Sequence, residues 1–130
     1  MKARGLMLAG AIAFSAAACV QAAPNVQHGE QVYVRCMACH ALAYNRVGPH
    51  HCGLFGRLAG SVPGFDYSLA MKKSKIVWNE KTLDLFLKNP QKMVPGTAMT
   101  YAGVPDPTDR ADLIAYLKQA TNPDSPQCRK

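Results

Sequence analysis

The alternation of hydrophobic and polar positions predicts helices joined by long loops, with no strand signal, repeat or low-complexity tract. The clearest helical spacing lies in residues 80–88, where Leu83, Phe86 and Leu87 recur every three or four positions. We expect these three side chains to face the interior. Pro90 marks the end of this helix, because the residue before a proline disfavours helical backbone.

Three further helices are predicted, at residues 26–37, 68–73 and 108–120. Asn25 and Ser68 precede the first two ranges, and such residues accept hydrogen bonds from the free amides that begin a helix. The last range carries its apolar residues on one side. These residues are Leu113, Leu117 and Ala120. The pattern as a whole predicts an all-α fold of about four to five helices.

Residues 1–22 have the pattern of a secretory signal peptide. Lys2 and Arg4 supply the positive start, an uncharged apolar run covers residues 6–18, and small residues precede a plausible cleavage site. A retained anchor is a weaker alternative because the apolar run is short for a membrane span, and a lipoprotein signal ending at Cys19 is weaker still. We therefore expect an exported, periplasmic protein without stable membrane insertion after cleavage.

Length and charge leave room for one small domain after this leader. Of the 130 residues, 108 remain, and removing Lys2 and Arg4 from the 15 basic residues leaves 13 against 8 acidic ones. A domain of this size has a thin core and gains from a covalent staple or a large buried cofactor. We expect the domain over residues 23–120 and a C-terminal tail over residues 121–130. Because the basic residues are scattered, nucleic-acid binding is not expected.

The candidate chemistry lies in Cys36-Met37-Ala38-Cys39-His40. Two cysteines three positions apart, with histidine directly after them, form the attachment pattern of c-type haem. On one helical turn, both thiols can form thioethers with the two vinyl groups of a single porphyrin. That tether holds His40 beneath the iron, where its neutral imidazole serves as the proximal ligand.

Two other uses of the cysteine pair are weaker. A zinc site needs a second set of ligands at short spacing, and only residues 50–52, His-His-Cys, offer one. A thioredoxin-like redox pair is expected after a strand, and no strand signal precedes Cys36.

The second axial ligand of a haem iron is sought among the remaining methionines. Prolines and glycines block regular structure across residues 89–107, so this segment could wrap the far face of the ring. Met93 and Met99 both lie there, and spacing alone favours Met99 without excluding Met93. Met71 and Met93 also suit a core-filling role.

Several further motifs occur in a fixed order along the chain. They are Val47-Gly48-Pro49, residues 53–57 (GLFGR), residues 63–68 (PGFDYS), Trp78, Asn89-Pro90, residues 94–99 (VPGTAM) and residues 110–117 (RADLIAYL). Together with the haem motif, they resemble the class I cytochromes c, in the branch of mitochondrial cytochrome c and bacterial cytochrome c2. The resemblance runs from about residue 29 to residue 117 and implies a small all-α fold whose long loops wrap one covalently bound haem c.

The resemblance also implies roles for individual residues. Met99 fills the slot of the family's sixth ligand, and the Pro49 carbonyl would accept the proton on the outer ring nitrogen of His40. Four residues match positions around the inner haem propionate, namely Arg57, Tyr67, Trp78 and Thr97. The first and last helices are expected to cross, with Gly29, Val32 and Tyr33 against Leu113, Tyr116 and Leu117.

Some positions depart from the family pattern. Phe86 replaces a tyrosine, Met71 replaces a polar residue, and His51 stands where an apolar residue is usual. Cys52 and Cys128 have no part in haem attachment. In an oxidising compartment, two such cysteines most often pair, which would tie the C-terminal tail to the loop beneath the haem. Free thiols or an intermolecular disulfide are the alternatives.

The resulting hypothesis is a soluble, exported one-electron carrier, not an enzyme, whose iron cycles between Fe(II) and Fe(III) with His40 and Met99 bound. The alternative is an enzyme or gas sensor in which Met99 leaves the iron. Membrane or periplasmic redox proteins are the expected partners, docking at the exposed haem edge of a monomer.

Overall fold

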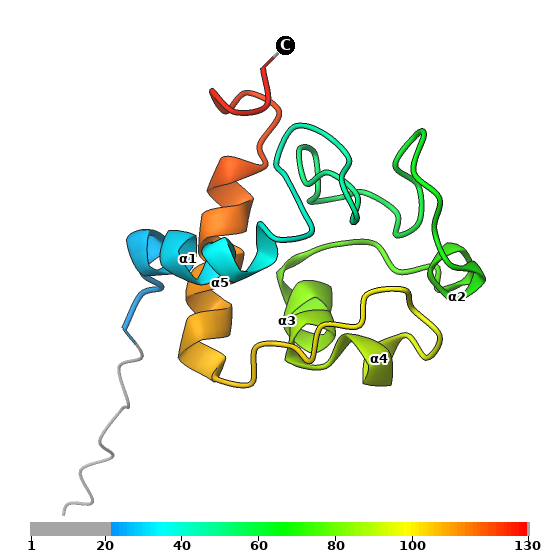
Figure 1. Ribbon diagram of the computed structural model, residues 1–130. Helices are drawn as coiled ribbons and strands as arrows, with labels where there is room; N and C mark the ends of the chain where they lie inside the picture. The colour runs from blue at the N-terminus through cyan, green and yellow to red at the C-terminus, as the bar shows by residue number, and fades with distance from the viewer. Residues whose placement is uncertain (1–21, 130) are drawn as a thin grey trace, which may run out of the picture.

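The structure, a computed structural model, describes residues 22–129, which form five α-helices and one 3-10 turn joined by long loops (Figure 1). A single isolated bridge between Leu58 and Val77 is the only β-pairing within these residues. The elements are α1 (Val26–Tyr33), the 3-10 turn η1 (Val34–Cys36), α2 (Leu69–Lys73), α3 (Glu80–Lys88), α4 (Pro90–Met93) and α5 (Pro107–Ala120). The all-α prediction is confirmed. Nearly all of the predicted leader lies outside the described residues.

The four predicted helices are present, and α1 and α2 begin at their predicted caps. The side chains of Asn25, Ser68 and Asn79 each accept a hydrogen bond from an amide in the first turn of α1, α2 and α3. The first helix is shorter than predicted, because α-helical geometry ends at Tyr33 and tightens to a 3-10 turn through Cys36.

The prediction that residues 89–107 are irregular is wrong at one end, where α4 forms. Pro90 is its first helical residue, a position where proline's missing N–H costs nothing because that amide would have no intrahelical partner. The Asn89 side chain accepts a hydrogen bond from the Lys92 amide at 2.9 Å and caps the turn. The same Asn-Pro pair therefore ends α3 and begins α4.

Helices α1 and α5 cross, as expected, and their contact fixes the two ends of the domain together (Figure 1). At the crossing, a Cβ atom on Gly29 would lie only 2.0 Å from the carbonyl oxygen of Asp112, so the helices approach at a distance that only glycine allows. Tyr33 packs on Tyr116 with ring centroids 5.3 Å apart. Leu113 of α5 is fully buried behind them.

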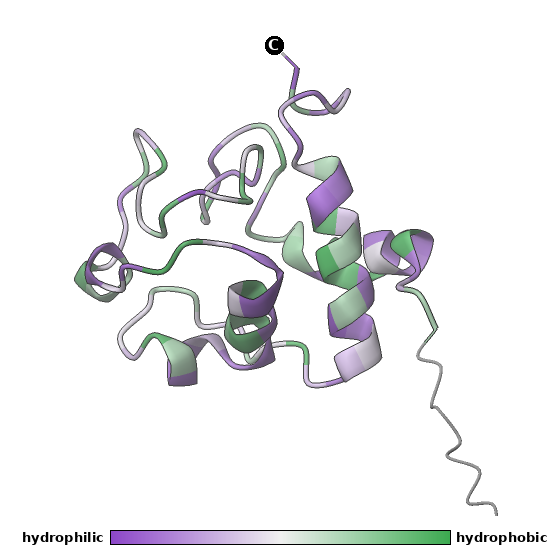
Figure 2. Ribbon diagram, turned by 180° about the vertical axis from the view of Figure 1, so that it is seen from behind, coloured by the Kyte–Doolittle hydropathy of each residue, from purple (hydrophilic) through white to green (hydrophobic). Residues whose placement is uncertain are grey.

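Helix α3 is joined to α5 by apolar packing and by one buried cation. Helix α3 is amphipathic and buries Leu83, Phe86 and Leu87. Helix α5 carries both hydrophobic and hydrophilic residues (Figure 2) and buries Arg110 and Asp112 together with its apolar residues. The Arg110 guanidinium donates to Asp84 at 2.6 Å and to the carbonyl of Val104 at 2.9 Å, while its side chain is almost fully buried. This arrangement holds the loop before α5 against α3.

The C-terminal tail folds back onto the loop that follows the haem motif. The Gly53 amide donates to the Thr121 carbonyl at 2.7 Å. The Cα atoms of Cys52 and Cys128 are 5.5 Å apart, a separation typical of disulfide-bonded pairs. The C-terminal end of the chain therefore meets this loop at Cys52 and Gly53.

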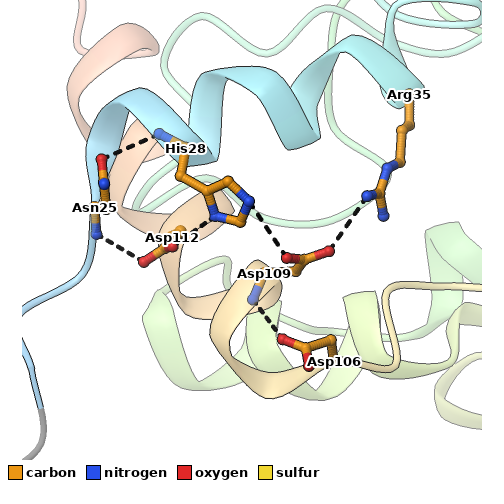
Figure 3. Close-up of polar contacts among 6 residues, drawn as sticks. All are labelled: Asn25, His28, Arg35, Asp106, Asp109 and Asp112. Carbon is orange, nitrogen blue, oxygen red and sulfur yellow. Dashed lines mark hydrogen bonds and ion pairs between the residues drawn. The ribbon is translucent and has the colours of Figure 1, made fainter.

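A polar cluster closes the outer side of the α1–α5 crossing (Figure 3). Asp112 is 5% exposed and accepts hydrogen bonds from the Asn25 amide at 2.7 Å and the His28 ring at 2.8 Å. The other ring nitrogen of His28 lies 3.6 Å from Asp109, which also pairs with Arg35 at 3.3 Å. The hydrogen bonds from His28 and Asn25 hold the pKa of Asp112 below its usual value.

Acid should weaken the α1–α5 contact through this cluster. Because the pKa of Asp112 is lower in the folded chain than its unfolded value of about 3.9, the carboxylate stabilises the fold above that pH. This contribution disappears as the pH falls through the folded-state pKa. The substitution Asp112→Asn should lower the free energy of unfolding by about 1–3 kcal/mol at neutral pH and flatten its decline in acid.

Urea unfolding at pH 7 and pH 3 measures both effects. Asp124→Asn is the matched control, since that carboxylate is exposed in the tail. If Asp112→Asn lost stability in acid as steeply as the wild type does, Asp112 would not be the group responsible.

Candidate functional site

One cavity of about 240 Å³ lies between α3, α5 and the long loops. Its wall is mostly apolar, and its lining brings together every residue that the sequence singled out as a site residue. These residues are Cys36, Cys39, His40, Pro49, Arg57, Tyr67, Trp78, Thr97 and Met99. They come from six separate motifs along the chain, so the fold assembles the site.

The Cys36–His40 segment is a single tight turn at the end of η1. The amides of Cys39 and His40 donate to the Cys36 carbonyl at 3.1 Å and 2.9 Å. The turn places both cysteines and the histidine on the cavity, with Cys36 half-buried and Cys39 exposed. Two attachment points and one nitrogen ligand therefore lie within five residues.

The His40 imidazole is held by its neighbours in one tautomer. Its Nδ1 lies 2.8 Å from the Pro49 carbonyl oxygen, and because a carbonyl only accepts, Nδ1 carries the proton and Nε2 keeps its lone pair. Burial lowers the pKa of His40, while the hydrogen bond to Pro49 opposes that shift. A Cβ atom on Gly48 would lie 2.3 Å from the His40 ring, so only glycine leaves room for the imidazole here.

The two methionines of the segment 89–107 lie in different places. Met99 lines the central cavity, and its amide donates to the Thr97 hydroxyl at 3.2 Å. Met93 instead lines a separate surface groove together with Ala70 and Pro95. Of the two candidates that spacing left open, only Met99 lies on the same cavity as His40.

Arg57 brings a partly buried positive charge to the cavity, without a carboxylate partner among the described residues. Its two terminal nitrogens donate to the carbonyls of Cys52 at 2.8 Å and His50 at 3.0 Å. Its Nε is buried and has no hydrogen-bond partner within residues 22–129. A guanidinium stays charged in proteins, and a buried charge needs a counter-charge. An anionic group in the cavity, such as a haem propionate, fits this orphaned donor.

The remaining predicted residues complete the wall on which Arg57 lies. Trp78 is buried and its ring centroid lies 5.0 Å from that of Phe86. Tyr67 packs against Phe65, and burial raises the pKa of its hydroxyl, which keeps it a neutral donor. Thr97 is buried as well.

One contact was missed by the sequence analysis. His51 stacks on His40 with ring centroids 4.3 Å apart and an angle of 23° between the planes. Its Nδ1 lies 3.0 Å from the Tyr33 hydroxyl. The departure from an apolar residue at position 51 was visible in the sequence, but Tyr33 was predicted only as a core residue.

The alternatives to haem find little support in this arrangement. For zinc, residues 22–129 contain no cluster of three or more His, Cys, Asp or Glu side chains that could hold a metal ion. For a redox dithiol, a low thiol pKa is required, whereas burial raises the pKa of the Cys36 thiol to about 11.

The comparison with known protein families decides between these interpretations. The family model for cytochrome c matches residues 26–121 of the chain, which include the cavity and both crossing helices. The chain belongs to the cytochrome c family. It therefore binds one covalent haem c through Cys36 and Cys39, and it is a haem-containing electron carrier of a family that acts with redox partner proteins.

Individual relatives from plants and bacteria agree with the family assignment. The chain is 46% identical to a cytochrome c of Sesamum indicum over 101 residues, covering 75% of this chain and 91% of the relative. It is 46% identical to a cytochrome c2 of Rhodomicrobium vannielii over 114 residues, covering 85% and 90%. Among solved structures, cytochrome cH from Methylobacterium extorquens matches with a TM-score of 0.70 and 41% identity, covering 72% of this chain and 97% of the other.

None of the helices of this family member within residues 22–129 is long and apolar enough to cross a bilayer.

Proposed function

We propose that the protein is a soluble, exported one-electron carrier with His40 and Met99 as the axial ligands of its haem iron. When bound, the haem takes up and releases one electron between Fe(II) and Fe(III). The observation that carries the proposal is the placement of His40 and Met99 on one cavity, with the lone pair of His40 Nε2 kept free by the hydrogen bond to Pro49.

The polypeptide supports this role by orienting ligands and excluding water. Pro49 fixes the tautomer of His40, and Thr97 holds the backbone of Met99. Apolar side chains on the cavity wall exclude water, which would otherwise compete with His40 and Met99 for the iron. Arg57, Tyr67, Trp78 and Thr97 are the proposed contacts of the buried propionate, with Arg57 supplying the counter-charge.

An enzyme or gas sensor would need a coordination position that opens, and Met99 is proposed to stay bound instead. Its backbone is tied to Thr97, which is buried, and this contact opposes movement of the ligand away from the cavity. We therefore propose that the protein has no enzymatic activity of its own.

The visible spectrum tests the axial ligands directly. Purified protein should show sharp low-spin bands when reduced and the weak far-red band of thioether-to-iron coordination when oxidised. A high-spin ferric spectrum without the far-red band would contradict Met99 ligation and favour the enzyme or sensor function.

Electron transfer is proposed to occur where the cavity reaches the surface. Cys39 is exposed there, and Val47, at 79% exposure, adds an apolar residue to the rim of the cavity. Redox partner proteins of the membrane or periplasm would dock on this edge, with the protein acting as a monomer. Residues 1–22 are proposed to direct export to the periplasm and to be cleaved.

Cys52 and Cys128 are proposed to form a disulfide that ties the tail to the loop beneath the haem. Their Cα separation of 5.5 Å and the hydrogen bond from Gly53 to Thr121 support this pairing. Alkylation of the unfolded, unreduced protein followed by mass spectrometry should modify neither thiol, and prior reduction should expose two. Two alkylatable thiols without reduction would contradict the disulfide.

A further inference from the structure

The face of the His40 ring is covered by a second imidazole. The ring centroids of His40 and His51 are 4.3 Å apart, and the two ring planes are only 23° from parallel. The His51 ring therefore blocks tilting of the His40 ring on that side. The hydrogen bond to Pro49 restrains one atom at the edge of the His40 ring. A hydrogen bond at the edge of the ring still allows the imidazole to rotate about the axis of that bond. A second ring stacked on the face of His40 opposes this rotation and so restrains the plane of the imidazole.

His51 is itself fixed at both its backbone and its ring. Its amide donates to the carbonyl of Leu42 at 3.0 Å, two residues after His40, which fixes the backbone of position 51 beside the haem motif. Its Nδ1 lies 3.0 Å from the Tyr33 hydroxyl.

Tyr33 provides a rigid anchor for this pair. Its side chain is 3% exposed and packs on Tyr116 at the crossing of α1 and α5. Its hydroxyl is therefore held by a buried contact between two helices, and that contact sets the position of the His51 ring.

We propose that Tyr33 and His51 act together as positioning residues that set the plane of the His40 imidazole. The inference rests on the proposed function, in which His40 is an axial ligand. The plane of an axial imidazole determines how its π orbital meets the iron d orbitals, and neighbours of a ligating histidine fix its orientation. Tyr33 acts only through His51, because its hydroxyl contacts the His51 ring.

Four variants of the haem-loaded protein test the proposal. Tyr33→Phe removes the hydroxyl and keeps the ring, His51→Leu replaces the stacked ring by an aliphatic side chain, and the double variant combines both. Tyr116→Phe is the matched control, since Tyr116 contacts the Tyr33 ring but its hydroxyl takes no part in the hydrogen bond between Tyr33 and His51. The readouts are the g values of the ferric protein by electron paramagnetic resonance and the haem-methyl shifts by NMR.

Tyr33→Phe and His51→Leu should each change the spread of the g values and the order of the haem-methyl shifts, while Tyr116→Phe leaves both unchanged. In the His51→Leu background, the added Tyr33→Phe change should have no further effect. A Tyr33→Phe spectrum that superimposes on that of the wild type would overturn the proposal, as would an equal effect of Tyr33→Phe with and without His51.

The far-red band separates this outcome from failure of the proposed function. If the wild type shows the band and Tyr33→Phe changes neither the g values nor the haem-methyl shifts, the proposed axial ligands are supported and the positioning role is wrong. If the wild type lacks the band, Met99 ligation is wrong, and the comparison of Tyr33→Phe with Tyr116→Phe still decides the role of the pair at His40.

Discussion

Met99→Ala should abolish the far-red band of the oxidised protein and lower the reduction potential by on the order of 100 mV, because axial ligands set haem potentials over a range of roughly 0.8 V. Alanine cannot reach the iron, so water and peroxide gain access to the vacated position. Peroxidase activity should therefore rise. Absorption spectroscopy, a redox titration and a peroxidase assay measure the three effects.

Met93→Ala is the matched control for this substitution. Met93 lies in the same segment but lines a separate groove, so its replacement should leave the band and the potential unchanged. Retention of the band in Met99→Ala together with its loss in Met93→Ala would reverse the ligand assignment.

Gly29→Ala should destabilise the domain although alanine is the better helix former. Helix propensity alone predicts a gain of about 1 kcal/mol. The new Cβ atom, however, would lie 2.0 Å from the Asp112 carbonyl oxygen and 2.9 Å from the Tyr116 Cβ atom. Because backbone must move to relieve the first contact, we expect a net loss of about 3 kcal/mol in the free energy of unfolding, the upper part of the usual range for overpacking.

Chemical denaturation of Gly29→Ala beside Glu30→Ala measures this loss. Glu30 is the next residue of α1 and is exposed, so its replacement should change the free energy of unfolding by no more than about 0.5 kcal/mol. A more stable Gly29→Ala variant would mean that α1 and α5 do not approach as closely as the structure indicates.

The helices were predictable where the sequence carries a local signal. Capping side chains at Asn25, Ser68 and Asn79 each act within three residues, and the apolar spacing of α3 is regular. Helix α4 was not predicted, because Pro90 was treated as a break although proline also suits the first position of a new helix. A proline can therefore mark either the end of one helix or the start of the next. At Pro90, the start of a helix is indicated by the hydrogen bond that the Asn89 side chain accepts from the Lys92 amide.

The site was predictable to the extent that covalent chemistry and family motifs locate it. The haem motif is contiguous, and the segment that carries Met99 is marked by its prolines and glycines. The contact between Tyr33 and His51 joins residues 18 positions apart and follows no spacing rule. The orphaned Nε of Arg57 likewise depends on the path of the loop carbonyls, which no residue pattern encodes.

The crossing of α1 with α5 determines when the chain can fold. The contact order of this pair is high, because the helix that begins at Val26 packs against one that begins at Pro107. During synthesis, α1 has no helix to cross until α5 has been made, although Tyr33 can meet His51 earlier. Any chain cut short before α5 therefore lacks the partner of its first helix, and premature termination should give unfolded protein without a partly functional product.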